Sequence, residues 1–191
     1  MNLRSTLAGM DRRLVLGGGL VLGSLAFTAG PVTPAIAAPA PLAWTPRALS
    51  LQQAQVLDAA AELIIPETDT PGARRAGVPQ FVDRALADYY PPPERQRIAR
   101  GLDQLDADAR AAHGAGFAAL NTEQQTAILN RHDAAEAAAG PGFFATLRDM
   151  VTTGYFTSEP GATLALRYDP VPGEYRACVP LSEIGRAWAT S

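Results

Sequence analysis

The sequence has little of the residues from which redox and hydrolytic sites are built. Cys178 is the only cysteine among 191 residues, and the histidines are limited to His113 and His132. One cysteine excludes an intramolecular disulfide, a c-type haem attachment motif and a cysteine-ligated iron–sulfur cluster within the chain. Two histidines on polar surfaces do not make a metal site. We expect Cys178 to be a free buried thiol, with a place at a partner interface as the alternative.

Motifs for nucleophilic catalysis and phosphate binding are missing as well. After the first 37 residues the chain has no G-x-S-x-G nucleophile elbow and no phosphate-binding loop. Asp106 and Asp108 form a carboxylate pair, but the helical pattern places both on a solvated face, where acid–base work is not expected. We therefore expect no catalytic, cofactor-binding or metal-binding residues in this chain.

Positive charge is also scarce, and lysine is absent altogether. Removing Arg4, Arg12, Arg13 and Asp11 with the leader described next takes the 16 basic and 19 acidic residues to 13 and 18, a net charge of about −5. A protein that neutralises nucleic-acid phosphates needs a basic surface. Nucleic acid is therefore not an expected partner.

The N-terminus predicts an export leader over residues 1–37. A charged start is followed by an apolar, glycine-rich run, and Ala35 and Ala37 form an A-x-A processing pattern with cleavage expected after Ala37. Arg12 and Arg13 stand directly before the apolar run, as in a twin-arginine signal; an ordinary secretory leader is the alternative. The apolar run is shorter than the roughly 20 residues that span a bilayer, which favours a removed leader over a retained anchor.

The rest of the chain predicts one all-α domain. Residues 38–49 are a proline-rich linker, and residues 50–191 provide enough chain for one core. No segment shows sustained two-residue alternation with β-branched residues, so a sheet is not expected. The predicted architecture is five or six helices around one core, followed by an irregular, aromatic and proline-rich C-terminal tail.

Capping residues and apolar spacing place the helices. Ser50 and Gln53 make a capping box, and Asn121 is a second N-cap. Gly154 fits the left-handed position just past a helix end, and Ser158 reads as the N-cap of a further short helix. The expected helices begin near positions 50, 78, 93, 121 and 143, and their buried side chains include Leu57, Phe81, Leu86, Tyr89, Ile98, Leu102, Leu105, Leu147 and Val151.

The C-terminal third is rich in large aromatic side chains among prolines. The rings are Tyr155, Phe156, Tyr168, Tyr175 and Trp188. Prolines between them prevent a long helix or strand that could cover these rings. We expect these five residues to form a partner interface, because large aromatics on a rigid segment are typical of interface anchors. The alternative is a tail that wraps its own helices.

The order and spacing of several short motifs resemble the gluconate 2-dehydrogenase subunit 3 family over most of the chain from about Ser50 to Pro180. The motifs are ELIIP at 62–66, TPGA at 70–73, GVPQFVD at 77–83, GFAAL at 116–120, FF at 143–144, GYFTS at 154–158 and PGEY at 172–175. Members are small subunits of periplasmic, membrane-associated dehydrogenases that oxidise sugars, polyols or aldonates. The resemblance implies no catalytic residue in this chain. It implies two partners: an FAD-containing large subunit of the glucose-methanol-choline type, and a multihaem cytochrome c subunit.

The leader and the resemblance support one hypothesis. The twin-arginine route moves folded proteins, usually because a cofactor is inserted before export, yet no cofactor site is evident here. We expect the chain to bind its flavoprotein in the cytoplasm, to supply the export signal, and to remain as a stabilising periplasmic subunit, with membrane association through the complex. The rival hypothesis is a self-contained periplasmic binding protein or enzyme with an unrecognised site.

Overall fold

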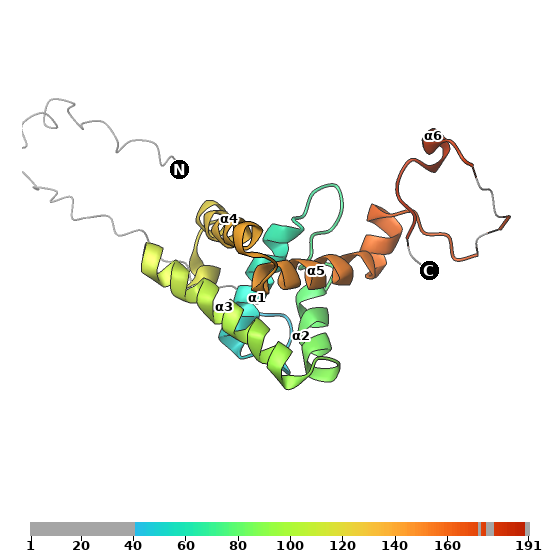
Figure 1. Cartoon of the computed structure of the whole chain (residues 1–191). Coiled ribbons are helices and arrows are strands. Elements are labelled where there is room, and N and C mark those ends of the chain that lie inside the picture. The colour runs from blue at the N-terminus through green and yellow to red at the C-terminus, as the bar shows by residue number, and fades with distance from the viewer. Residues whose placement is uncertain (1–40, 172, 175–177, 190–191) are drawn as a thin grey trace, which may run out of the picture. The chain divides into compact units, whose positions relative to one another are not determined.

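The computed structural model of the chain describes residues 41–171, 173–174 and 178–189 (Figure 1). The predicted leader lies outside these residues, including Arg12, Arg13, Ala35 and Ala37, and so does Tyr175.

The described residues form helices, which confirms the predicted all-α fold class. The elements are α1 (Leu51–Ile64), α2 (Val78–Asp88), α3 (Pro92–His113), a 3₁₀ turn η1 (Phe117–Ala119), α4 (Thr122–Ala139), α5 (Phe143–Phe156), a π-helical turn η2 (Gly161–Ala165) and a short α6 (Leu181–Ile184). Within the described part of the chain the extended pairing is a single parallel bridge between Arg167 and Trp188. None of the helices described is long and apolar enough to cross a membrane.

The helix starts follow the capping residues. Ser50 accepts a hydrogen bond from the Gln53 amide and completes the predicted capping box of α1. Asn121 and Gln124 form the same reciprocal pair at the start of α4. Each box provides acceptors for amides that have no partner inside the helix. Both predicted helix starts are confirmed.

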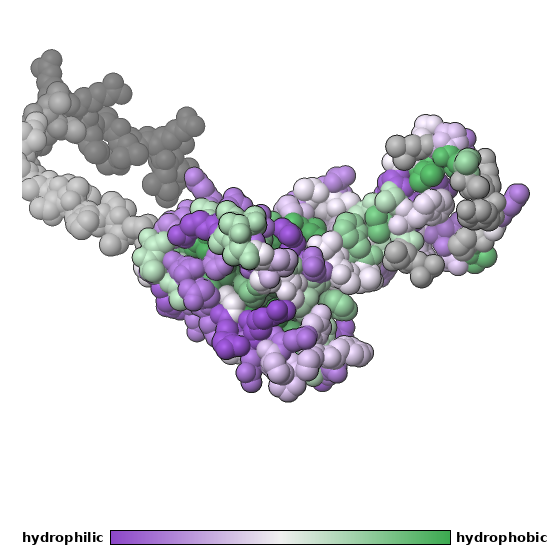
Figure 2. Space-filling model, in the orientation of Figure 1, coloured by the Kyte–Doolittle hydropathy of each residue, from purple (hydrophilic) through white to green (hydrophobic). Residues whose placement is uncertain are grey.

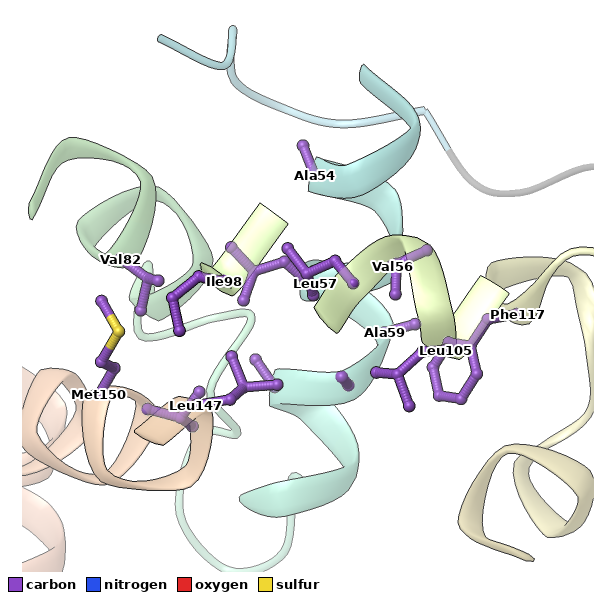
Figure 3. Packing of buried hydrophobic residues seen from close by; sticks show 14 of the residues in the cluster. Ala54, Val56, Leu57, Ala59, Val82, Ile98, Leu105, Phe117, Leu147 and Met150 are labelled. Atoms are coloured by element: carbon purple, nitrogen blue, oxygen red, sulfur yellow. The ribbon is translucent and has the colours of Figure 1, made fainter. Parts of the chain in front are cut away.

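The core is built around α1, which contacts α2, α3, α4, α5 and η1 (Figure 1). Its buried face is largely alanine, and small side chains let neighbouring helices approach closely. Side chains from the surrounding elements meet there, as Figure 3 shows for Leu57, Val82, Ile98, Phe117 and Leu147, all of which are fully buried. Burying each large apolar side chain contributes roughly 1.5–3 kcal/mol, so this cluster is the main source of stability. The predicted buried positions Ile98, Leu102 and Leu105 are confirmed.

The prediction that α5 ends at Gly154 is wrong. The helix continues to Phe156, and Gly154 does not take the left-handed conformation. A Cβ atom at position 154 would lie 2.7 Å from Cδ1 of Phe81 and 3.2 Å from Cγ1 of Val78. Glycine is therefore required here for close packing of α2 on α5 and not for a helix end.

The apolar face predicted for α2 is also partly wrong. Leu86 is buried as expected, whereas Phe81 is 38% exposed and Tyr89 is 85% exposed. Phe81 lies beside Gly154 at the edge of the α2–α5 contact, and Tyr89 follows the last residue of the helix. The spacing of apolar residues predicted a wider buried face than the structure has, because α5 covers only part of the apolar side of α2.

The segment before α1 is held against α2 by one buried carboxylate. Asp83 is 1% exposed and accepts hydrogen bonds from three consecutive backbone amides, those of Arg47, Ala48 and Leu49, at 2.7–3.1 Å. The Arg47 guanidinium also makes a two-pronged ion pair with Asp88. Leu49 is buried, and Leu42 and Trp44 pack against the core. Residues 41–49 are therefore part of the packed domain.

Candidate functional site

Both histidines of the helical body take part in structural contacts. His132 lies 2.8 Å from Asp108 and joins α4 to α3, and the His113 ring lies 3.4 Å from the Gln124 amide nitrogen. Among the residues described, no group of three or more histidine, cysteine, aspartate or glutamate side chains is placed to hold a metal ion.

Asp106 contradicts the predicted solvated carboxylate pair, because it is buried. Its carboxylate accepts hydrogen bonds from Gln52 of α1, Arg110 of α3 and the amide of Phe117 in η1, at 2.6–2.8 Å. Burial alone would raise the pKa of Asp106, but the hydrogen bonds from Arg110, Phe117 and Gln52 outweigh burial and lower this pKa below its usual value. The ionised carboxylate of Asp106 therefore connects α1, α3 and η1. The spacing of residues in the sequence does not indicate its hydrogen-bond partners on α1 and η1.

Glu136 has a comparable structural role at the start of α5. That helix begins after Gly142, which has no side chain to cap it, and Glu136 of α4 accepts hydrogen bonds from the amides of Gly142, Phe144 and Ala145 at 2.7–3.0 Å. Burial raises the pKa of Glu136, and these three bonds lower it by more, so the pKa lies below its usual value. The carboxylate thus caps a helix to which it does not belong.

Two shallow hollows lie side by side along α1 and share Gln55 and Ala118 in their walls. Their volumes are about 190 and 130 Å³, and an ion pair between Asp58 and Arg74 lies at the larger one. Sites for small molecules usually measure roughly 300–1,000 Å³. Neither hollow has the size or the glycine-rich phosphate loop that FAD requires, so these residues do not fit a flavin.

The remaining candidate is the segment that follows α5, residues 161–189, which we call the C-terminal arm. Arg167 joins its outgoing and returning parts. The backbone of Arg167 donates to Ala187 and accepts from Ala189, each at 2.8 Å, and its guanidinium lies 4.2 Å from the ring centre of Trp188. Arg167 also donates to the carbonyl of Glu183.

A second arginine and the end of α5 add to this arrangement. Arg186 donates to the carbonyl of Leu164, so two arginines of the arm bind backbone carbonyls of the arm itself. Ser158 accepts a hydrogen bond from the Gly161 amide and donates to the carbonyl of Tyr155, so its side chain makes the predicted capping bond, although the residue directly before η2 is Pro160. Ala165 packs against the core. The arm is thus fixed to α5 at its base and closed on itself further along.

The arm concentrates exposed apolar side chains. Eight large apolar side chains are exposed among the described residues, and four belong to the arm, with a fifth, Phe156, just before it. The four in the arm are Leu164, Tyr168, Val171 and Trp188, with 49%, 52%, 79% and 47% of their surfaces exposed. Figure 2 shows hydrophobic residues in green on this part of the chain. Exposed apolar side chains gathered on one segment are typical of interaction sites.

The structure divides the five predicted interface aromatics. Tyr155 is only 2% exposed, and its hydroxyl donates to Thr70 and to the carbonyl of Pro71, so Tyr155 belongs to the core of its own subunit and its prediction as an interface residue is wrong. Phe156, Tyr168 and Trp188 are exposed. Tyr175 lies outside the described residues.

Other arm residues differ from the sequence prediction or were missed by it. Cys178 is exposed, which contradicts the expected buried thiol. Leu164, Val171 and Arg167 were not identified as candidate interface residues. A signal for Val171 was present, since it stands between Pro170 and Pro172, where a regular element that could cover it cannot form.

Comparison with known proteins gives one match. A family model described as gluconate 2-dehydrogenase subunit 3 matches residues 51–173, which include the helical body from α1 to η2 and the outgoing part of the arm. No curated protein and no solved structure matches the chain.

Proposed function

The chain belongs to the gluconate 2-dehydrogenase subunit 3 family, and we propose that it is the small, non-catalytic subunit of a dehydrogenase complex that oxidises a sugar, a polyol or an aldonate. The family match over residues 51–173 is the observation that carries this proposal, because it spans the helical body. In the proposed complex the large subunit binds FAD and carries out the oxidation, and a multihaem cytochrome c subunit accepts the electrons. The small subunit binds and stabilises the large one.

The contacts of the acidic side chains support a non-catalytic role. Asp83, Asp106 and Glu136 each accept several hydrogen bonds from their own domain, mainly from backbone amides. A carboxylate occupied in this way has little capacity left to take a proton from a substrate. The two hollows along α1 do not fit FAD, which supports the proposal that the flavin is bound by the large subunit.

The second part of the proposal concerns export. The leader with Arg12 and Arg13 is a twin-arginine signal that carries the folded pair, small subunit and flavoprotein together, into the periplasm. The complex is attached to the membrane by its other subunits. In this proposal the small subunit carries no flavin, and the folded cargo that requires this route is the partner.

Co-purification tests the proposal. The full-length chain with an affinity tag is produced in the host that carries its gene, and the purified material is assayed for flavin and for sugar- or polyol-dependent reduction of an electron-accepting dye. We expect a large, flavin-containing subunit in a fixed ratio to the tagged chain, with dye reduction by the pair. The same chain produced in an unrelated host is the control, and it should contain no flavin and reduce no dye. Flavin or activity in that control would instead support the self-contained enzyme.

A further inference from the structure

We propose that the C-terminal arm binds the flavoprotein subunit in a form assembled in advance by Arg167, with Leu164, Tyr168, Val171 and Trp188 as its apolar contacts. This inference rests on the proposed function, because it names the surface through which that partner is bound.

The arm is closed by contacts that fix its shape. The Arg167 backbone forms hydrogen bonds with Ala187 and Ala189, and its side chain both covers one face of Trp188 and donates to Glu183. Arg186 adds a bond to the carbonyl of Leu164. These contacts join residues about 20 positions apart across a segment rich in proline. Arg167 is thus a positioning residue that holds the two parts of the arm in register.

The described residues of the arm are irregular apart from the short elements η2 and α6, and such a segment needs a reason. Connections longer than about 12–15 residues without regular structure are uncommon in compact domains, and they are usually functional or disordered. Ordering the backbone costs free energy, yet Val171 keeps 79% and Trp188 keeps 47% of its surface exposed within their own chain. Burial against a partner would supply the missing compensation, and fixing the arm before binding lowers the entropy cost of association.

The large subunit is the occupant that the observations favour. The chain belongs to a family of dehydrogenase subunits, so its structure has to include a surface for another subunit. Twenty-five residues of the arm are described, and each side of a standard protein–protein interface contributes roughly 20–30 residues. Both arginines of the arm that are described bind carbonyls of the arm itself, and tyrosine, tryptophan and aliphatic side chains are exposed beside the carboxylates of Asp169 and Glu174. Such a surface fits an apolar groove.

The test uses the full-length chain and the flavin-containing subunit recovered in the co-purification experiment. Dissociation constants are measured for the wild-type chain and for Val171→Ser, Trp188→Ala and Arg167→Gln. We expect each substitution to weaken binding about tenfold or more, as for interface anchors. The matched controls are Leu51→Ser and Tyr89→Ala, which remove exposed apolar side chains of the helical body, 61% and 85% exposed. These controls should change the dissociation constant less than about twofold.

Further measurements separate a positioning role from a structural one. Helicity by circular dichroism should be unchanged in every arm variant, and proteolysis within the arm should be faster for Arg167→Gln. The double variant with Arg167→Gln and Trp188→Ala should have the same dissociation constant as whichever single variant binds less tightly. The reason is that both substitutions remove the contact between Arg167 and Trp188. A loss of helicity together with binding would show that the arm belongs to the subunit's own core, and would overturn the inference.

Other outcomes overturn the inference in distinguishable ways. If the wild-type chain binds the flavoprotein and the arm variants bind it equally well, the arm is not the interface, and the proposed function still stands. If the wild-type chain recovers no flavoprotein, the proposed function fails and this inference fails with it. If light scattering shows a dimer that Trp188→Ala dissociates while flavoprotein binding is retained, the occupant is a second copy of this chain.

Discussion

The ring of Phe81 on α2 lies against Gly154 on α5, in the space that a side chain at position 154 would occupy. The helices α2 and α5 contact each other here, and the motifs GVPQFVD and GYFTS lie at these two helices. Both motifs therefore have a structural explanation in the packing of α2 on α5.

Replacing Gly154 by alanine should destabilise the domain by about 1–3 kcal/mol, the usual cost of overpacking. In a helix with open space around this position, the same change would instead stabilise the domain by roughly 0.5–1 kcal/mol. The sign of the change in the free energy of unfolding therefore shows whether Phe81 fills the space beside Gly154. The measurement is urea unfolding followed by circular dichroism. Phe81→Ala in the same chain should relieve most of the loss. Stabilisation by Gly154→Ala alone would contradict the packing role.

Asp83→Asn should release the segment before α1. The amide group of asparagine offers one acceptor oxygen and points a donor at backbone amides that are themselves donors, so buried groups lose partners. We expect a loss of about 2–3 kcal/mol in the free energy of unfolding, and faster proteolysis between Trp44 and Leu49. Asp88→Asn is the matched control on the same helix. Its ion pair with Arg47 is exposed, so the loss should stay below about 1 kcal/mol.

Glu136→Ala should fray the start of α5. Three amides lose their acceptor, and the cost expected for losing a helix cap is about 1–2 kcal/mol. Hydrogen exchange should show the greatest loss of protection at Phe144 and Ala145. Asp133→Ala, which removes an exposed ion pair from the same helix, should leave these amides protected. Equal effects from the two substitutions would argue against a capping role.

Stability should fall in acid over a defined range. The pKa values of Asp106, Asp108 and Glu136 are lowered in the folded protein, because hydrogen bonds to the carboxylates outweigh the opposing effect of burial. The unfolded chain then binds protons more readily than the folded one, so these groups contribute their full stability above the unfolded pKa values of about 4. This contribution is lost as the pH falls through the lower folded values.

Urea unfolding at a series of pH values tests this dependence. From pH 7 to about 5 the carboxylates should add no pH dependence, and below about pH 4 the free energy of unfolding should decline. Glu136→Gln should lose less stability between pH 5 and pH 3 than the wild-type chain, since it has one titrating group fewer. An equal or steeper decline in the variant would contradict the assignment of a lowered pKa to Glu136.

Replacing Arg12 and Arg13 together with lysine should leave both the small subunit and its flavoprotein in the cytoplasm. The arginine pair is read by a receptor, and lysine keeps the charge but not the geometry of the guanidinium. Cell fractionation with activity assays measures the outcome. Replacing Arg4 with lysine is the control, and export should continue. A flavoprotein that reaches the periplasm while this chain stays behind would show that the signal is not shared.

The sequence by itself determined the features that depend on neighbours within a few positions. Ser50 with Gln53 and Asn121 with Gln124 set two helix starts, Ser158 set a third, and the spacing of apolar residues along α3 indicated its buried side. Capping and amphipathic spacing act within one or two helical turns, so one chain segment contains all the information. The family motifs could be read in the same way, since they are runs of adjacent residues.

Only the tertiary structure decided which polar and aromatic residues face inward. Tyr155 and Phe156 are adjacent in sequence, yet Tyr155 reaches the loop at Thr70 and is buried, while Phe156 is exposed. In the sequence Asp83 and Asp106 look like surface carboxylates. In the folded structure they accept hydrogen bonds from the backbone amides of Leu49 and Phe117, which belong to other segments of the chain. The reason is physical: burying a charge is favourable only when hydrogen-bond donors surround it, and here those donors come from parts of the chain that only folding brings together.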